Sequence, residues 1–524
     1  MVYSLGINAS AATLTKLRTQ TQSSVSGMCV TCLDGCPGLC EVGRSAIRGK
    51  EVLYPQPFGK TTSASQKKYP IDYSHFSIMG TAVGAYGVDP DPDKAIFPAV
   101  DLRSALGADE SLKLRLPFVI AAMGSTNVAA NNWEHLAAGA AISGCGIVIG
   151  ENVCAMDPKA EIKNGRIVKS PAMEERIKAF TEWAGDDGFI AVQANVEDTR
   201  LGVHEWVIEK YGITSVELKW GQGAKDIGGE VKLNTLKRAL QLKSRGYIVL
   251  PDPEDPAVQA AFEAGAFKEF ERHSRIGMVD YESFMQRVEE LRKAGAKYIF
   301  LKTGAYRPAD LARAVKYASD AKLDLLTVDG AGGGTGMSPW RMMNEWGVPT
   351  LHLQALLYNY LETLRKKEKY LPPVAMAGGF SLEDHIFKVL AIGAPYMKAV
   401  GMARAPLAAA MVGKTVGEAL REGKVAAEYQ KYGDTIEQVF IGATELKEIL
   451  GDGFKRLPVG AIGVYTYFQR LAQGLRQLMC GARKFRLDLI DRDDVAALTR
   501  EAAELTGIRY IADVDAEEVE KILG

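Results

Sequence analysis

The chain has 524 residues, of which 47% are hydrophobic and 24% are charged, and its formal net charge is −1. This length exceeds the size at which one core stops growing, so we expect one large domain with appendages or two to three domains. The balanced charge gives no electrostatic footprint for nucleic acid or an anionic membrane. The sequence has no signal peptide and no apolar run near the roughly 18 residues of a membrane span, so we expect a cytoplasmic protein without membrane insertion.

Residues 1–115 form an irregular N-terminal region whose main feature is a run of cysteines. Four of the seven cysteines lie in "CVTCLDGCPGLC", at Cys29, Cys32, Cys36 and Cys40. In a reducing compartment, clustered thiols are more often metal ligands than disulfides. This spacing lets one loop bring four thiolates around one centre. An iron–sulfur cluster and a structural zinc ion both suit such a centre, and an uncommitted thiol loop is the third interpretation.

The segment 116–429 alternates short apolar runs with amphipathic helical patterns, which is typical of βα units. We expect eight strands, at residues 117–123, 146–150, 189–195, 215–220, 297–304, 323–329, 373–379 and 396–402. Eight strands over roughly 285 residues fit an α/β fold of the (β/α)8 TIM barrel type, and a doubly wound sheet is the competing architecture. The barrel is favoured because polar or glycine residues recur where strands end, at Asn195, Lys219, Lys302, Asp329, Gly378 and Gly401.

Two further segments complete the predicted organisation. Segment 221–280 is long for one βα unit, so we expect an insertion there. Residues 430–524 have helical patterns and end in the acidic amphipathic run "DVDAEEVEKIL". We therefore predict an N-terminal region with the cysteine cluster (1–115), a barrel (116–429) and a C-terminal helical appendage (430–524).

A glycine-rich loop follows the predicted strand 323–329, since five of the seven residues at 330–336 are glycine. A Walker loop requires Gly-Lys-Ser/Thr, but Gly336 precedes Met337, and no phase of the run satisfies GxGxxG. The remaining interpretation is a βα loop whose backbone passes close to a flat or bulky ligand, where a Cβ would collide. A mobile surface loop is the alternative.

A second group of glycines ends the last two predicted strands, at Gly378, Gly379 and Gly401. In barrels the loops after strands seven and eight commonly form a phosphate site from backbone N–H groups and a helix N-terminus. Arg404 can add a charged donor to such a site. The glycines at the ends of the last two strands therefore predict a phosphate site at the C-terminal rim.

Several longer stretches resemble the FMN-binding domain of glutamate synthases. They are "LKWGQGAKDIGGE" (218–230), "VDGAGGGTGMSPW" (328–340) and "AGGFSLEDHIFKVLAIGAPYMKAVGMA" (377–403), in the order of that family's motifs. The stretch "GSTNVAANNWEHLAAGAAISGCGIVIGEN" (124–152) resembles the first βα unit of the family, and "LTREAAELTGI" (498–508) resembles the tail of its archaeal-type members. The resemblance covers about residues 115–420 and implies an FMN-dependent oxidoreductase.

The resemblance also implies three catalytic residues. Lys219 matches a family lysine near the flavin and the 2-oxo acid, where a cation favours the anionic reduced flavin and pairs with a substrate carboxylate. Glu151 matches a glutamate that faces the imine or ammonia. Lys302 resembles a strand-end lysine that points at the flavin. An unpaired cation in an apolar strand is costly, so we expect both lysines to have a ligand partner.

Residues that contact the cofactor are implied in the same way. Ala122 to Gly124 would lie against the isoalloxazine, glycines 332–334 would line the flavin and substrate mouth, and the backbone at 378–379 and 401–402 would hold the phosphate. The full set is Ala122, Met123, Gly124, Gln193, Gln222, Asp329, Gly332, Gly333, Gly334, Gly378, Gly379, Gly401 and Met402. Lys225 follows Gln222 in the same motif.

The sequence departs from the family in two places. Glutamate synthases carry a glutaminase domain with an N-terminal cysteine nucleophile, but this chain begins Met1-Val2-Tyr3 and has no cysteine before Cys29. The family's iron–sulfur cysteines follow the last phosphate loop, where this sequence has none. Because a flavin needs an electron route, we prefer a 4Fe–4S cluster at the N-terminal cysteines, with zinc as the alternative.

We therefore expect an FMN- and iron–sulfur-dependent oxidoreductase of the glutamate synthase type. Its most concrete reaction is reductive amination of 2-oxoglutarate with externally supplied ammonia. The expected partners are ferredoxin or a redox subunit, and a separate glutaminase. A flavoprotein acting on a different substrate and a non-catalytic electron-transfer subunit of a larger complex are the alternatives.

Overall fold

The computed structural model describes residues 41–55, 58, 65, 67, 69–223, 227–334 and 337–524. Its centre is a closed barrel of eight parallel strands in chain order, each paired with the next and the last with the first. The strands are β4 (Phe118–Met123), β5 (Gly146–Ile149), β8 (Phe189–Ala194), β9 (Ser215–Lys219), β13 (Tyr298–Thr303), β14 (Leu325–Asp329), β15 (Val374–Ala377) and β16 (Met397–Met402). All eight predicted strands form, which confirms the (β/α)8 barrel and rules out the open sheet.

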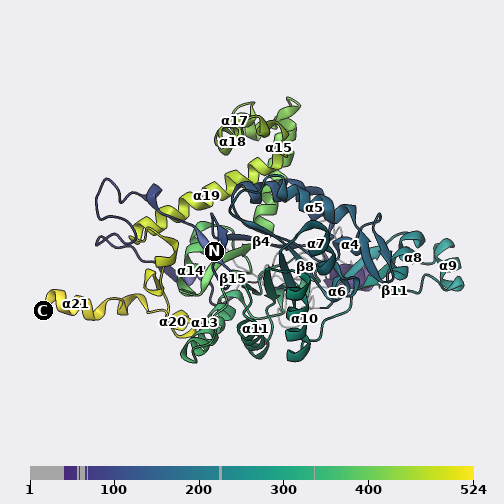
Figure 1. Ribbon diagram of the computed structural model, residues 1–524, viewed down its shortest axis with the longest axis horizontal. Coiled ribbons are helices and arrows are strands. Elements are labelled where there is room, and N and C mark those ends of the chain that lie inside the picture. The colour runs from purple at the N-terminus through teal and green to yellow at the C-terminus, as the bar shows by residue number, and fades with distance from the viewer. Residues whose placement is uncertain are drawn as a thin grey trace, which may run out of the picture.

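Helices surround the barrel and connect its strands (Figure 1). They are α3 (Asn127–Ile142), α4 (Val153–Met156), α5 (Pro171–Thr181), α6 (Val196–Leu201), α7 (Val203–Tyr211), α10 (Tyr281–Ala294), α11 (Pro308–Asp320), α12 (Trp340–Asn344), α13 (Thr350–Lys366), α14 (Glu383–Ile392) and α15 (Arg404–Arg421). Most of these helices bury apolar residues against the outward-facing residues of the strands, which explains why barrel strands are apolar on both faces.

The barrel interior changes character from one end to the other. Alternate residues of each strand point inward. Near the strand N-terminal ends the inward residues are apolar and form one cluster, whose members include Val119, Val148, Phe189, Phe300 and Leu325. Near the C-terminal ends the inward residues of β8, β9, β13 and β14 are polar or charged, and they include Gln193, Glu217, Lys219, Lys302 and Asp329. The charged end is where a barrel can carry chemistry.

The N-terminal region closes the apolar end of the barrel. The hairpin of β2 (Ser104–Leu106) and β3 (Leu112–Leu114) inserts Leu106, Leu112 and Leu114 into the same apolar cluster as the strands. Before it, helix α2 (Glu41–Arg48) leads to an ion pair of Lys50 with Glu271. Strand β1 (Phe76–Ile78) pairs with β17 (Val495–Ala497), near the end of the described chain.

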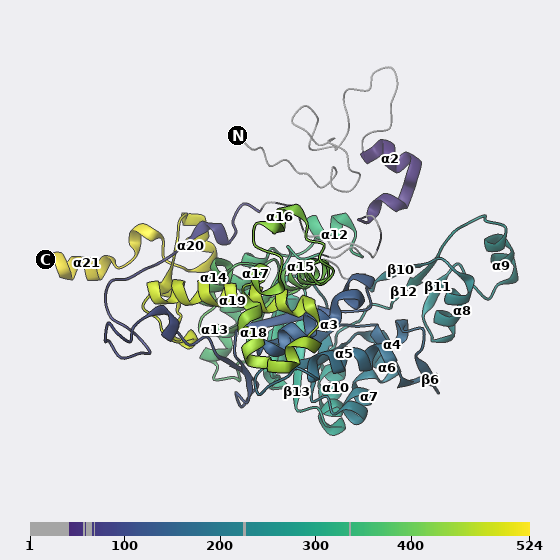
Figure 2. The same ribbon diagram turned by 90° about the horizontal axis from the view of Figure 1, so that it is seen from above.

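Two insertions extend the loops at the charged end. A hairpin of β6 (Glu161–Lys163) and β7 (Arg166–Lys169) follows β5. The insertion predicted at 221–280 forms a three-stranded antiparallel sheet with two helices, and it projects from one side of the barrel (Figure 2). Its elements are β10 (Glu230–Leu233), α8 (Leu236–Ser244), β11 (Ile248–Leu250), α9 (Pro256–Glu263) and β12 (Phe270–His273).

The C-terminal region is helical, as predicted, and its longest helix packs tightly on the barrel. Its helices are α16 (Ala427–Gln430), α17 (Ile436–Val439), α18 (Gly442–Leu450), α19 (Val459–Gly481), α20 (Arg500–Thr506) and α21 (Ala516–Leu523). Glycines allow α19 to approach α15 and α3, since a Cβ on Gly413 would lie 2.7 Å from the Gly460 carbonyl oxygen and one on Gly139 would lie 2.5 Å from Val464. Because one core cluster joins α19 to the barrel, the boundary at 430 stays a prediction. Within the described chain, no helix combines the length and apolar character needed to cross a bilayer.

Candidate active site

A cavity of about 480 Å³ opens at the C-terminal ends of the barrel strands. Most residues expected at the cofactor line it, although they come from strand ends far apart in the sequence. Those that line it are Ala122, Met123, Gly124, Glu151, Lys219, Gln222, Lys302, Asp329, Gly333, Gly334, Gly378, Gly379, Gly401, Met402 and Arg404. The barrel brings these residues together because parallel strands end at the same rim.

One end of the cavity has the features of a phosphate site. Helix α15 begins at Arg404, directly after β16, so its unsatisfied N–H groups lie at the cavity wall. Gly379 has a φ of +118°, and a Cβ built on it would meet only the Gly332 carbonyl oxygen, at 4.0 Å. Burial lowers the pKa of the Arg404 guanidinium, whose Nη2 donates to the Gly332 carbonyl at 3.3 Å. Among described residues, Asp329 acts on the charge of Arg404 but no carboxylate forms an ion pair with it, so the guanidinium and the helix N-terminus together favour an anion at this end of the cavity.

The glycine-rich loop serves two purposes that its sequence does not separate. A Cβ on Gly330 would lie 2.5 Å from the Cα of Thr350, and one on Gly332, at φ +141°, would lie 2.8 Å from the Gly378 carbonyl oxygen. These two glycines are required by the protein itself. A Cβ on Gly333 would meet only an Asp329 oxygen, at 3.7 Å, and Gly333 lines the cavity. Gly333 therefore leaves space for a ligand, whereas Gly330 and Gly332 do not.

The end of β4 is held in place by a buried arginine. Arg176 is 5% exposed and donates from Nη1 to the Met123 carbonyl (3.0 Å) and from Nη2 to the Gly124 carbonyl (2.9 Å). Its guanidinium also lies 4.8 Å from the Trp133 ring centroid. A Cβ on Gly124 would lie 2.4 Å from the Glu151 carbonyl oxygen. This backbone is therefore fixed in position, and Gly124 adds no side chain where it meets the cavity.

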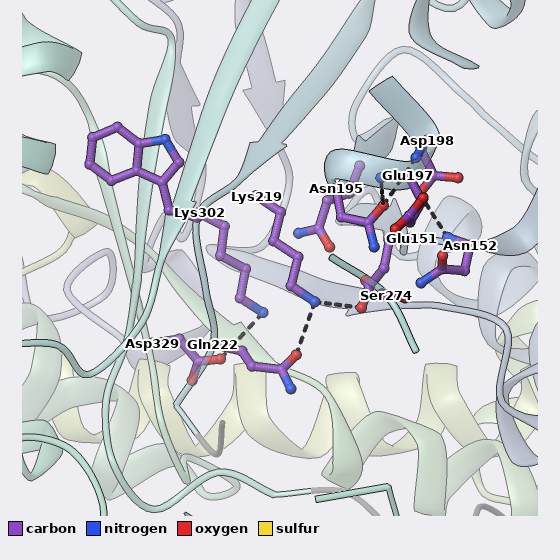
Figure 3. Close-up of polar contacts among 12 residues, drawn as sticks. Glu151, Asn152, Asn195, Glu197, Asp198, Lys219, Gln222, Ser274, Lys302 and Asp329 are labelled. Atoms are coloured by element: carbon purple, nitrogen blue, oxygen red, sulfur yellow. Dashed lines mark hydrogen bonds and ion pairs between the residues drawn. The ribbon is translucent and has the colours of Figure 1, made fainter. Parts of the chain in front are cut away.

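A lysine and a glutamate form a hydrogen-bonded pair at the cavity wall. Lys219 Nζ donates to Glu151 Oε1 at 2.5 Å and to Gln222 Oε1 at 3.1 Å (Figure 3). The two charged side chains are 14% and 22% exposed, respectively. Partial burial strengthens such a charge-assisted hydrogen bond and still leaves both groups accessible to a ligand.

A second lysine lies deeper, on the neighbouring strand β13. Lys302 Nζ lies 3.3 Å from Asp329 Oδ2, and both side chains are nearly buried (Figure 3). Burial alone lowers the pKa of Lys302, but Asp329 and then Glu217 outweigh it, so the net shift is upward and the cation persists. Burial raises the pKa of Glu217 to about 7, although Lys302 and a 2.6 Å hydrogen bond from Gln193 Nε2 oppose the shift.

Several cavity residues lie outside the predicted set. The insertion contributes Arg272 and Arg275, and Arg275 forms an ion pair of 2.9 Å with Glu197. Asn195, expected only as a strand-end polar residue, accepts hydrogen bonds from the first turn of α6 and also lines the cavity. The sequence signal for the insertion residues was the pair of arginines in "ERHSR", but nothing local links that segment to the barrel rim.

Some predicted residues are not brought to the cavity. Gln193 points inward one layer below it, is 1% exposed and bonds to Glu217, while Gly332 packs on Gly378 behind the cavity wall. Lys225 and the four cysteines at 29, 32, 36 and 40 lie outside the described residues. In the ranges that the structure does describe, no cluster of three or more histidine, cysteine or acidic side chains forms a metal site.

We compared the chain with curated protein sequences, solved structures and protein-family models to find which proteins it resembles. No curated protein sequence matches the chain. A flavocytochrome b2 mutant solved with pyruvate bound superposes with a TM-score of 0.46 at 14% identity, covering 86% of this chain and 82% of that one. A lactate oxidase from Pediococcus acidilactici superposes with a TM-score of 0.42 at 13% identity, covering 79% and 81%. The family model described as "Conserved region in glutamate synthase" matches residues 272–413, which confirms the resemblance found in the motifs. The matched residues run from β12 of the insertion into helix α15, so this part of the chain is similar to the conserved region of glutamate synthase.

Proposed function

We propose that this protein is an FMN-dependent oxidoreductase of the glutamate synthase type. One observation carries the proposal: a single cavity joins an anion-binding end, formed by Gly379, the start of α15 and Arg404, to two lysine–carboxylate pairs. A phosphorylated ligand with a redox-active ring suits this combination of groups. The family match over 272–413 supports the same proposal.

The residues at this cavity fit FMN. Its phosphate would lie at the start of α15, where backbone N–H groups and Arg404 favour a dianion. Its ring would lie against the fixed backbone at 122–124 and against Gly333, which has no side chain and faces the cavity. FMN, when bound, supplies reversible storage of a hydride or of single electrons.

The side chains around the cavity have separate roles. Lys302 stays protonated beside Asp329, so it supplies a permanent positive charge that stabilises negative charge developing nearby. Lys219 and Glu151 share a short hydrogen bond, so Glu151 can accept or return a proton at its carboxylate while Lys219 orients it. Gln222 fixes the position of the Lys219 ammonium through the second hydrogen bond.

The substrate that fits this arrangement is a 2-oxo acid. We propose reductive amination of 2-oxoglutarate, with ammonia supplied by a separate glutaminase or from solution. The Lys219–Glu151 pair carries both signs of charge at the cavity wall, as a carboxylate substrate and an ammonium ion together require. Other carboxylic acids remain alternatives that the test below separates.

Electron supply is a second part of the proposal. Cys29, Cys32, Cys36 and Cys40 would hold a 4Fe–4S cluster that accepts electrons from ferredoxin or a partner subunit. Iron, sulfide and zinc analysis of anaerobically purified protein tests it. Four iron and four sulfide per chain are expected, whereas stoichiometric zinc would replace the cluster with a structural ion.

The decisive experiment is anaerobic. The yellow FMN-loaded protein is reduced and then mixed with 2-oxoglutarate, with and without ammonium, while flavin absorbance and glutamate are measured. Flavin reoxidation with stoichiometric glutamate, only when ammonium is present, is the expected result. Reoxidation without ammonium would indicate a different substrate. A colourless protein that cannot be reconstituted with FMN would overturn the proposed function.

A further inference from the structure

The charges around the cavity do not balance. Five cationic side chains of the described chain line it, and three of them have a carboxylate partner. Lys219 pairs with Glu151, Lys302 with Asp329 and Arg275 with Glu197. In the described part of the chain, no carboxylate lies within ion-pair distance of Arg404 or Arg272, although Asp329 acts on Arg404, and Glu197, Asp198 and Glu151 act on Arg272, from farther away. Arg404 belongs to the proposed phosphate end, which leaves Arg272 without an assigned partner.

Arg272 occupies an unusual place for a charged residue. It stands on the central strand of the insertion sheet, opposite Val231 on β10 and Val249 on β11. Because strand residues alternate between faces, it shares the buried face with Phe270, while Glu271 points to the other side and pairs with Lys232. The side chain of Arg272 is 2% exposed. A cation on an apolar face is costly unless something charged meets it.

The contacts of Arg272 within the protein use only part of its guanidinium. Nη1 donates to Ser274 Oγ at 2.5 Å, and the guanidinium lies 4.5 Å from the Tyr247 ring centroid. These contacts fix its plane. Among described residues its Nε has no hydrogen-bond acceptor. An arginine held rigidly beside a cavity, with a donor unused, is preorganised for a planar anion that can accept two parallel hydrogen bonds.

We infer that Arg272 binds a carboxylate group of the substrate and so makes the insertion the specificity-determining wall of the site. This inference rests on the proposed function, because it takes the phosphate end at Arg404 to be filled by FMN. It names the substrate as an organic acid whose carboxylate lies against β12, at a wall distinct from the barrel strands. The substrate then supplies the direct ion-pair partner that Arg272 does not have among the described residues.

The test measures carboxylate binding separately from flavin binding. FMN-loaded protein is titrated with 2-oxoglutarate, pyruvate and oxalate, and the perturbation of the flavin spectrum gives each dissociation constant. Arg272→Gln should bind the tightest of these acids roughly 10- to 150-fold more weakly than the wild type and should bind FMN equally well. The control is Lys243→Gln, which removes a cation of the same insertion that pairs with Asp252 and Glu254 away from the cavity. It should change neither constant.

Further measurements keep the inference falsifiable. If Arg272→Gln does not fold, the wild type is titrated with the monoamide of the tightest-binding acid, which should bind at least about tenfold more weakly. Equal binding of acid and amide, equal binding by Arg272→Gln, or no binding of any acid by the wild type would each overturn the inference. Failure to bind FMN would instead overturn the proposed function, and calorimetric titration of the flavin-free protein with the same acids would still test Arg272.

Discussion

The two ends of the barrel interior are built from the same strands but have opposite chemistry. At the N-terminal end, Phe189, Phe300 and Leu325 meet the leucines of the β2–β3 hairpin in an apolar cluster. At the C-terminal end, the inward positions carry Glu217, Lys219 and Lys302. The apolar end supplies hydrophobic stabilisation, which allows the charged end to hold groups that oppose folding. The residues that stabilise the fold and the residues that can carry chemistry thus lie at opposite ends of the barrel axis, about two residues apart along each strand.

The largest effect should come from the charged end. Lys219→Met removes the cation that pairs with Glu151 and Gln222, so kcat should fall about 10²- to 10⁴-fold. FMN content and thermal unfolding temperature should stay close to wild type, because Lys219 does not contribute to the apolar cluster. Unchanged turnover would remove its assigned role. Flavin absorbance, calorimetry and steady-state kinetics measure the three quantities.

The opposite result is expected at the apolar end. Phe300 is fully buried and its ring centroid lies 5.2 Å from that of Phe189. Phe300→Ala should lower the free energy of unfolding by about 3–5 kcal/mol through lost burial and a cavity. At low temperature, where the variant is folded, its FMN affinity should equal that of the wild type. A variant with normal stability and weak FMN binding would contradict the separation of the two ends.

Glu217 stands at the boundary between the two ends, and it should make stability depend on pH. Burial raises its pKa to about 7 from an ordinary value of 4.5. The folded protein thus holds this proton more tightly than the unfolded chain, so the stabilisation is complete below the unfolded pKa and is lost as pH rises through 7. Glu217→Gln should remove this loss. In urea unfolding, the free energy of unfolding of Glu217→Gln minus that of the wild type should increase between about pH 5 and pH 8, by up to about 3 kcal/mol. A constant difference would contradict the assignment.

The smallest effect concerns one donor at the phosphate end. Arg404→Met should weaken FMN binding roughly 10- to 150-fold. Riboflavin, which lacks the phosphate, should bind the variant and the wild type equally. This ligand pair separates loss of a phosphate contact from general damage to the cavity. Equal weakening of both ligands would show that Arg404 acts by packing and not by charge.

Much of the barrel could be predicted because its signals are local. Each strand is a short apolar run followed by a helical pattern, and Lys219, Lys302 and Asp329 are visible as charged residues at strand ends. What could not be predicted depends on contacts between distant segments. The depth of Gln193 in the barrel follows from how the strands are staggered, which the sequence does not display. The place of Arg272 depends on how the insertion folds back over the rim.

The glycine loop illustrates the same limit at finer scale. Gly330 and Gly333 are alike in the sequence, but a Cβ on Gly330 would collide with Thr350, whereas Gly333 faces the cavity. The single hydroxyl hydrogen of Thr350 is shared between the carbonyl oxygens of Gly378 and Ala331, which lie 2.8 and 3.1 Å from Oγ1, so Thr350 joins the two glycine loops. The position of Thr350, beyond the next helix, could not be inferred from the loop itself.

The crossing of α19 over α15 and α3 has a consequence for the order in which the protein matures. The start of α15 forms the anion-binding end, yet α19, which supports α15, follows it by nearly forty residues of chain (421 to 459). During synthesis the amino-terminal part leaves the ribosome first. Loading of the nucleotide should therefore wait until residue 481 has emerged, which ribosome-stalled chains of increasing length, assayed for flavin fluorescence quenching, would reveal. A newly synthesised barrel would then not bind the nucleotide until α19 had packed against α15.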